Sequence, residues 1–511
     1  MSASQTLESV RRVGVAVSIA AVLAAGGVWA GASSAAEPGG PSKMSKEAKP
    51  TDYQPKDFRP DPSYQDKPYS PGAQTDIYGG KRALDAPRPL LELFRPIYEE
   101  GPFRPGTNVF GDKNLAFPAF SIFGDWRTAI AHNNNGDVET GQIATRLNLD
   151  VDLKLTATER IHGFFRPLDR GGKFTRYEFF GDDRKQGDLN LDGNIETMFF
   201  EGDVGAMMSG ITGKDSKFDL PIAAGLTPFL FQNGIWVEDA FVGGGASVVA
   251  KNSRLFDISN LDVTIFGGFD KVTSPAIKNG DGTLNDDDLS VYGIAAFIEA
   301  NEGYWEAGYG AIRGRNNFAD DGYQSLTLAF TRRYGGWLSN SLRTIWTFGQ
   351  DRNQGRQQTA DGIIFLAENS FVTSKPSTLV PYLNLWVGLD RPQPLADDTG
   401  ILKNTGINFE TDALTGFPKL DDTGNDTYGG ALGIQYLFDL DKQLVFEFAT
   451  VKILGDVNEP GRAAKDDQYG FGIRYQQPIS PAWIVRADAM YGILKSVDDI
   501  SGIRVELRRK F

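Results

Sequence analysis

The sequence predicts an all-β protein, a transmembrane antiparallel β-barrel of about 18 strands, with about 16 to 18 as the expected range. Three observations predict this class. Many segments alternate apolar and polar residues, and the connections between them are alternately short and long. The last segment of the chain also alternates, and it ends on an aromatic residue, Phe511.

The alternating segments predict strands, because only a strand turns successive side chains to opposite faces. In the clearest segment, 143–155, the odd positions are apolar or Thr, and the even positions from Arg146 onward are polar. The same period recurs at 444–449, 469–476 and 483–491. A strand with one lipid face and one wet face needs this period. The pattern leaves the strand boundaries between Phe164 and Leu230 open.

The connections support a barrel over a soluble sandwich. Reading back from a periplasmic C-terminus, short inner turns should alternate with longer outer loops. The short turns are 477–481, 439–442, 374–376, 334–337, 301–303 and 251–254. The longer loops are 455–467, 391–425, 351–360, 314–321 and 272–288. One outer connection, 232–235, is predicted to be a tight Asn-Gly hairpin.

The N-terminal part predicts export and an extension. Arg11 and Arg12 precede an apolar run that ends in small residues, so we expect 1–36 to be a signal peptide. A membrane anchor is the alternative. Residues 37–110 hold half of the 26 prolines and predict a periplasmic extension, largely extended or disordered. Its apolar patch 90–94 is expected to pack on the barrel or enter its mouth. The barrel is expected to occupy 111–511.

The composition excludes several classes of function. Without Cys the chain has no disulfides, thiol catalysis or Cys-bound metal or haem. His132 and His162 are its only imidazoles, and no Gly-x-Ser-x-Gly motif accompanies them. A net charge of −14 argues against nucleic acid as a partner. We therefore expect no enzymatic activity and no cofactor.

The polar positions of the strands predict the residues that line the barrel interior. The strip Arg474, Arg486, Arg504 and Arg508 outnumbers the carboxylates near it, which predicts a wall that guides anionic solutes. The alternative is that these charges pair across strands and brace the barrel. The predicted pore-lining residues are Arg146, Asp150, Asp152, Lys154, Arg343, Glu447, Arg474, Arg486, Asp488, Arg504, Glu506 and Arg508.

Two acidic stretches are weak candidates for metal binding. Asp188, Asn190 and Asp192 match the start of an EF-hand loop, but Phe199 stands where the bidentate Glu belongs. Residues 279–288 form an acidic outer loop that is either a cation site or only solvated. We therefore expect no firm metal site.

The terminal aromatic of an alternating strand resembles the assembly signal of bacterial outer-membrane barrels. Over Ala116 to Phe511 the architecture resembles the alginate-export and the phosphate- or carbohydrate-selective porins. This resemblance implies a porin-like channel in the outer membrane of a Gram-negative-type bacterium, passing small hydrophilic solutes, anionic or carbohydrate among them. It implies contacts with membrane lipids, lipopolysaccharide and the barrel-assembly machinery, with Phe511 as the assembly signal, and it allows a homo-oligomer. The alternative is a barrel that anchors or sheathes an assembly through the N-terminal segment.

Overall fold

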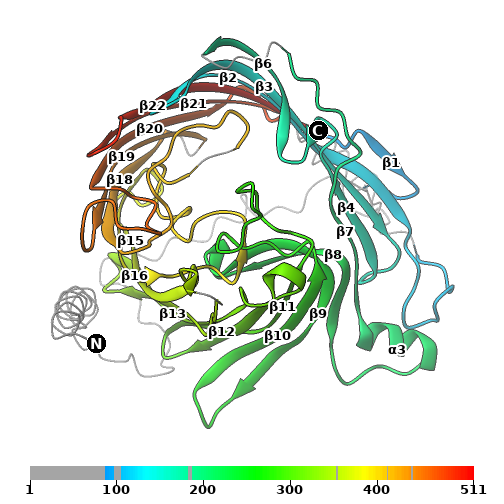
Figure 1. Cartoon of the computed structure of the whole chain (residues 1–511). Helices are drawn as coiled ribbons and strands as arrows, with labels where there is room; N and C mark the ends of the chain where they lie inside the picture. The colour runs from blue at the N-terminus through cyan, green and yellow to red at the C-terminus, as the bar shows by residue number, and fades with distance from the viewer. Residues whose placement is uncertain (1–86, 97–104, 182–186, 353–354, 411–412, 439–440) are drawn as a thin grey trace, which may run out of the picture.

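The chain folds into a closed antiparallel barrel of 18 strands, which confirms the predicted fold class. The computed structural model describes residues 87–96, 105–181, 187–352, 355–410, 413–438 and 441–511. The predicted signal peptide and most of the Pro-rich segment lie outside the described residues, so both stay predictions. Figure 1 shows the strands as a ring in chain order, from β2 round to β22.

Except around β4 and β6, each barrel strand pairs with its neighbours in sequence, and β22 pairs with β2 to close the ring. The strands are β2 (Ala119–Asn135), β3 (Glu139–Lys154), β4 (Arg160–Phe165), β6 (Lys173–Gly181), β7 (Ile195–Asp203), β8 (Pro221–Phe231), β9 (Val237–Ser253), β10 (Ile258–Asp270), β11 (Leu289–Ala300), β12 (Gly303–Gly314), β13 (Tyr323–Tyr334), β14 (Leu338–Phe348), β15 (Asp361–Phe371), β16 (Leu379–Arg391), β18 (Thr427–Phe438), β19 (Lys442–Ile453), β20 (Gln468–Pro478), β21 (Trp483–Leu494) and β22 (Ile500–Lys510).

Strands β4 and β6 together fill one position of the barrel. β3 pairs with β4 through Leu149–Lys154 and with β6 through Thr140–Thr145. Between them the chain makes an excursion that includes the short strand β5 (Asp169–Arg170), paired with the start of β6. Gly171 and Gly172 turn this hairpin with positive φ angles of 54° and 73°. The interrupted strand explains why the alternation does not resolve this region.

The two ends of the barrel differ, as the connection lengths predict. At the end where Phe511 lies, called the Phe511 end, turns such as 301–302 and 335–337 are short. At the opposite end, called the loop end, connections such as 271–288, 349–360 and 392–426 are long. The predicted tight hairpin is present, with the 3₁₀ turn η3 (Gln232–Gly234) between β8 and β9. A second 3₁₀ turn, η4 (Asn316–Phe318), lies between β12 and β13.

One helix was not predicted. α3 (Val204–Thr212) follows β7 at the Phe511 end and lies outside the ring of strands (Figure 1). The Asp203 carboxylate caps it by accepting from Ala206 N at 2.7 Å, and Gly213 ends it with a φ of 69°. In the described part of the chain, no helix is long and apolar enough to cross a membrane.

The barrel seam is extended by the N-terminal segment. Asp125–Asn135 of β2 pair with β22, and Phe511 and Gly124 then exchange two backbone hydrogen bonds of 2.9 and 3.1 Å. Beyond this point β2 continues, and the short strand β1 (Leu91–Leu93) pairs with Phe120–Ile122. The patch 90–94 therefore packs on the barrel as an edge strand that continues the line of β22.

The two faces of the sheet have opposite character. The outer face carries exposed apolar side chains on successive strands, among them Trp126, Phe448, Ile473, Val505 and Leu507. The intervening positions on the same strands face inward and are largely polar, charged or Gly. This arrangement suits a barrel whose outer wall faces lipid and whose backbone groups are all paired within the sheet.

Deleting Phe511 should slow formation of the closed barrel. The deletion removes two backbone hydrogen bonds at the seam, worth about 0.5–1.5 kcal/mol each. The time course of heat-modifiable mobility on a gel measures closure. Phe511→Ala keeps both backbone hydrogen bonds and is the control. If this variant folds as slowly as the deletion, the aromatic side chain of Phe511, and not its backbone hydrogen bonds, sets the rate of closure.

Candidate functional site

In the connection between β16 and β18, the described residues 392–410 and 413–426 fold into the barrel and are called the inward segment (Figure 1). Its first part forms β17 (Ala396–Asp397), which runs parallel to the start of β9. Tyr323 Oη of β13 lies 2.9 Å from the Pro394 carbonyl oxygen and donates to it. Lys403 Nζ lies 2.6 Å from Asp397 and 2.8 Å from Glu238. Burial lowers the pKa of Lys403, but attraction to these carboxylates outweighs it and leaves the pKa above its usual value.

The middle of the inward segment is held by one buried carboxylate, Glu447 on β19. Its oxygens accept from Ile407 N and Asn408 N at 2.9 Å each, and from Asn408 Nδ2 at 2.8 Å. Tyr382 Oη of β16 also donates to Glu447. Four donors satisfy the hydrogen-bonding capacity of this buried carboxylate. Glu447 therefore fixes the position of the inward segment along the barrel axis.

The last part of the inward segment reaches the strands that close the barrel. The Thr415 carbonyl accepts from Asn133 Nδ2 of β2 at 2.6 Å and from Gln142 Nε2 of β3 at 2.7 Å. Phe417 lies under the Arg504 guanidinium, whose carbon is 5.1 Å from the ring centre. The segment therefore crosses the barrel from β9 to the seam and narrows its interior.

A second element narrows the interior from the other side. The turn between β8 and β9 reaches β13 and β14, where Trp236 Nε1 donates to Ser325 Oγ at 3.0 Å. Arg343 of β14 donates to the Gln232 carbonyl oxygen at 2.5 Å, and its side chain is only 1% exposed. Arg343 therefore braces this turn. The turn also meets the inward segment, because Leu395 N donates to the Trp236 carbonyl oxygen at 2.7 Å.

The predicted basic strip is present as a wall of arginines on β20–β22, but its charges are paired. Asp488 accepts from Arg474 and Arg504 at 2.7 Å and from Arg486 at 2.9 Å. Glu410 of the inward segment lies 2.7 Å from Arg474 and 3.6 Å from Arg486. The pairing of Asp488 with these arginines agrees with the alternative interpretation of the sequence, in which charges pair across strands and brace the barrel. Glu410, in contrast, is a loop carboxylate that the strand pattern does not reveal.

The remaining predicted residues continue this inner wall. Arg508 lies 3.4 Å from both Glu506 and Asp125. Arg146 stacks over Phe174 with its guanidinium carbon 5.5 Å from the ring centre. Asp150 and Lys154 occupy inward positions of β3, opposite Phe164 and Arg160 of β4. That all these residues line a conducting path stays a prediction.

The two imidazoles, His132 and His162, each lie beside carboxylates. His162 lies between Asp152, at 3.5 Å, and Glu201, at 3.1 Å, and stacks on Phe199. His132 Nε2 lies 3.1 Å from Glu139. Both rings are therefore held by carboxylates.

The weak metal candidates use their side chains elsewhere. Asn190 Nδ2 donates to the Phe174 carbonyl oxygen at 3.1 Å, and Asp192 lies 3.8 Å from Arg170. Asp188 pairs through its backbone with Arg176. In loop 279–288, Asp286 binds Lys271 at 2.8 Å. Among the described residues, no group of three or more His, Asp or Glu side chains is placed to hold a metal ion.

Three of the long connections meet the inward segment and enclose with it a cavity of about 730 Å³ at the loop end. Its charged lining is six basic residues and two carboxylates, although the chain as a whole carries −14. The basic residues are Lys278, Arg352, Arg391, Lys419, Arg462 and Lys465. The sequence pattern does not reveal this basic cavity, because its residues come from separate loops and share no period.

The comparisons with solved structures agree with the fold. OccAB4 of Acinetobacter baumannii has a TM-score of 0.50 and 10% identity over 77% of this chain and 98% of its own. OccK9 (OpdG) of Pseudomonas aeruginosa has a TM-score of 0.50 and 11% identity over the same shares. Both are substrate-specific outer-membrane porins. At such identities the likeness shows the fold alone, and no family model or curated protein matches the sequence.

Fold and site together define the class: a transmembrane antiparallel β-barrel of 18 strands with a constricted, charged interior. The neighbouring structures share this barrel architecture. The finer resemblance to the alginate-export group is not confirmed and stays a prediction.

Replacing Glu447 by Gln should loosen the inward segment. An amide has one acceptor oxygen where the carboxylate has two, and losing charge-assisted bonds here should cost about 1.5–3 kcal/mol. Single-channel recording should then show a larger and noisier conductance. Glu306→Gln, another inward carboxylate, is the control. Unchanged conductance in the Glu447 variant would mean that the segment does not set the pore width.

Proposed function

We propose that this protein is an outer-membrane channel that passes small hydrophilic solutes and favours anions. The proposal rests on the size and the charged lining of the barrel interior. A barrel of 18 strands falls in the size range of porins that keep an aqueous channel. Here that interior is narrowed by an ordered segment and lined by charged side chains, as a selective pore requires.

The preference for anions rests on two groups of basic residues along one path. The cavity at the loop end is lined by six basic residues and two carboxylates. Arg352, Arg391 and Arg462 also pair with carboxylates outside the lining, so Lys278 and Lys465 are the basic residues most open to a solute. Deeper in the barrel, Arg474 and Arg486 are 15% and 13% exposed, while Glu410, which binds both, is 38% exposed. An anion entering from the loop end therefore meets the basic lining of the cavity first, and at the constriction it meets arginines whose charge Asp488 and Glu410 partly offset. Sugars and carboxylated sugars belong to the size class of such a cavity.

The charge of the inner wall should set ion selectivity. Replacing Arg474, Arg486, Arg504 and Arg508 by Gln leaves Asp488 and Glu410 unpaired, so the anion-to-cation permeability ratio should fall at least about threefold. Glu410→Gln removes the opposing charge and should shift the reversal potential in the opposite direction. The measurement is the reversal potential under a salt gradient. Equal potentials in all three proteins would sink the anion preference.

The basic cavity at the loop end should bind anions before they pass. Lys278 and Lys465 are exposed residues of its lining. The double variant K278Q/K465Q should raise the concentration of an anionic oligosaccharide that half-blocks the current, by roughly three- to tenfold. The matched control is K271Q/K495Q, which removes two loop-end lysines outside the lining. Equal loss of block in both variants would show a diffuse field and no defined cavity site.

In this proposal the barrel carries out no catalytic step, and its partners are membrane lipids, the barrel-assembly machinery and the solute. The pairing of β1 with β2 favours a second role, because it fixes the N-terminal segment at the Phe511 end. In that role residues 37–86 would hold a periplasmic partner. Deleting them should then release the partner but leave conductance intact, whereas a plain extension would release nothing.

A further inference from the structure

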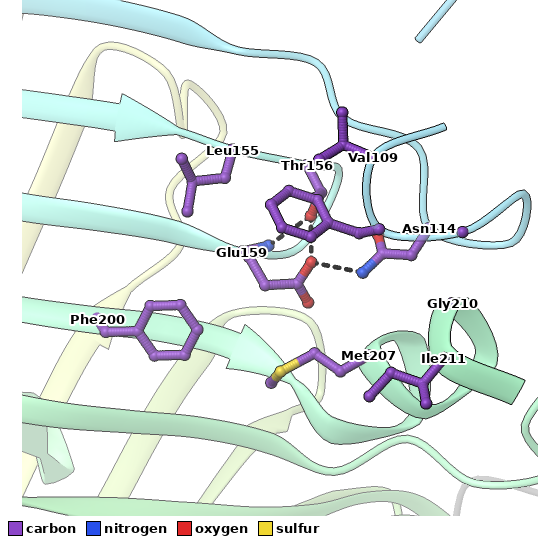
Figure 2. Close-up of a pocket in the computed structure, with 11 residues that line it drawn as sticks. Val109, Asn114, Leu155, Thr156, Glu159, Phe200, Met207, Gly210 and Ile211 are labelled. Atoms are coloured by element: carbon purple, nitrogen blue, oxygen red, sulfur yellow. Dashed lines mark hydrogen bonds between the residues drawn. The ribbon is translucent and has the colours of Figure 1, made fainter. Parts of the chain in front are cut away.

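A second cavity lies on the outside of the barrel at the Phe511 end, next to α3. It has a volume of about 570 Å³ and is walled by the segment 105–116, the turn 155–159 and α3. Figure 2 shows its side chains, among which Val109, Leu155, Phe200, Met207 and Ile211 are apolar. This size falls in the range of about 300–1,000 Å³ typical of small-molecule sites.

The walls of this outer cavity are built by a close backbone contact. A Cβ added at Gly111 would lie 2.0 Å from the Gly210 carbonyl oxygen, and one at Gly210 would lie 2.3 Å from that of Phe110. Only Gly at both places allows the segment 105–116 to approach α3 this closely. The bridge between Thr107 and Ala116 shapes the same segment. The cavity is therefore held open by fixed backbone.

The one charged residue of the lining, Glu159, already has its partners. Its carboxylate accepts from Asn114 Nδ2 at 2.8 Å, from Thr158 Oγ1 at 2.6 Å and from Thr156 Oγ1 (Figure 2). Burial raises the pKa of Glu159, but these hydrogen bonds outweigh it and hold the pKa below its usual value. A carboxylate satisfied in this way leaves the apolar walls to determine what binds.

We propose that the outer cavity binds one acyl chain of a membrane phospholipid. Its walls continue the lipid-facing side of the barrel, because Phe200 lies on the same face of β7 as the exposed Met198 and pairs with the exposed Ile161 of β4. A chain in the bilayer thus reaches the cavity from the apolar outer face of the barrel, as favourable burial requires.

The helix supplies the features expected beside a lipid headgroup. Ile211 of α3 is 79% exposed at the rim of the cavity, in position to lie among acyl chains. Lys214 and Lys217 follow the helix and are exposed, and they alternate with the exposed Asp215 and Asp219. An exposed apolar helix residue followed by charged residues that can meet a zwitterionic headgroup is typical of elements that lie in the membrane interface.

The test is photo-crosslinking in lipid vesicles. The full-length barrel is reconstituted in phosphatidylcholine containing a phosphatidylethanolamine whose acyl chain ends in a diazirine, and labelled peptides are mapped by mass spectrometry. Peptides with Leu155, Phe200 and Met207 should carry at least about fivefold more label than the turn at Leu255 and Phe256, which lies at the same end and is also exposed. Both Val109→Trp, which fills the cavity, and Ile211→Asp should remove this excess.

The matched control is Leu255→Asp, because Leu255 is 85% exposed, close to Ile211, but lies outside the cavity. It should leave the labelling of the cavity unchanged, and heat-modifiable mobility shows that every variant is folded. Equal labelling of the cavity and of the turn would overturn the proposal. So would cavity labelling that persists in both variants. Absence of label from the cavity would show that another occupant, such as the chain's own N-terminal segment, fills it.

Discussion

The pairing of β22 with β2 is the constraint on which the rest of the structure depends. Within a membrane no water can hydrogen-bond to the open edge of a sheet. Each unpaired backbone group at such an edge therefore costs several kcal/mol. The seam removes that edge over the whole length of β22, down to Gly124 and Phe511. Where the last strand stops, β1 takes its place beside β2. Only in the closed barrel does the polar face of the sheet enclose an interior while the apolar face is turned outward to lipid.

Inside the ring, two kinds of interaction hold the inward segment. Its apolar residues pack together and on the wall, as Phe409 does edge-on to Trp386 at 5.1 Å between ring centres. Its polar groups bind fixed partners, above all Glu447. The charged groups of the wall also bind fixed partners. Three arginines surround Asp488 at 2.7–2.9 Å, and these ion pairs offset the cost of burying its carboxylate. The charge left facing the solute is then set by side chains that remain partly exposed, such as Glu410.

The sequence predicted the barrel, because a period of two is a local property of the chain. It left the region between Phe164 and Leu230 open, where β4 and β6 form one interrupted strand and Asp203 starts a short helix. The fold of the inward segment was not predictable in this way. Its contacts, such as Asn133 with Thr415, join residues 282 positions apart and leave no local pattern. The basic cavity escaped for the same reason.

The reach of the inward segment has a consequence for the order in which the molecule is made. Its partners include β9, which is synthesised well before it, and β22, which comes last, as well as β2 and β3 at the start of the barrel. The site for its final part therefore exists only after the first and last strands have met. In a half-built barrel this final part lacks its partners on β2, β3 and β22, so the constriction is complete only when the barrel has closed.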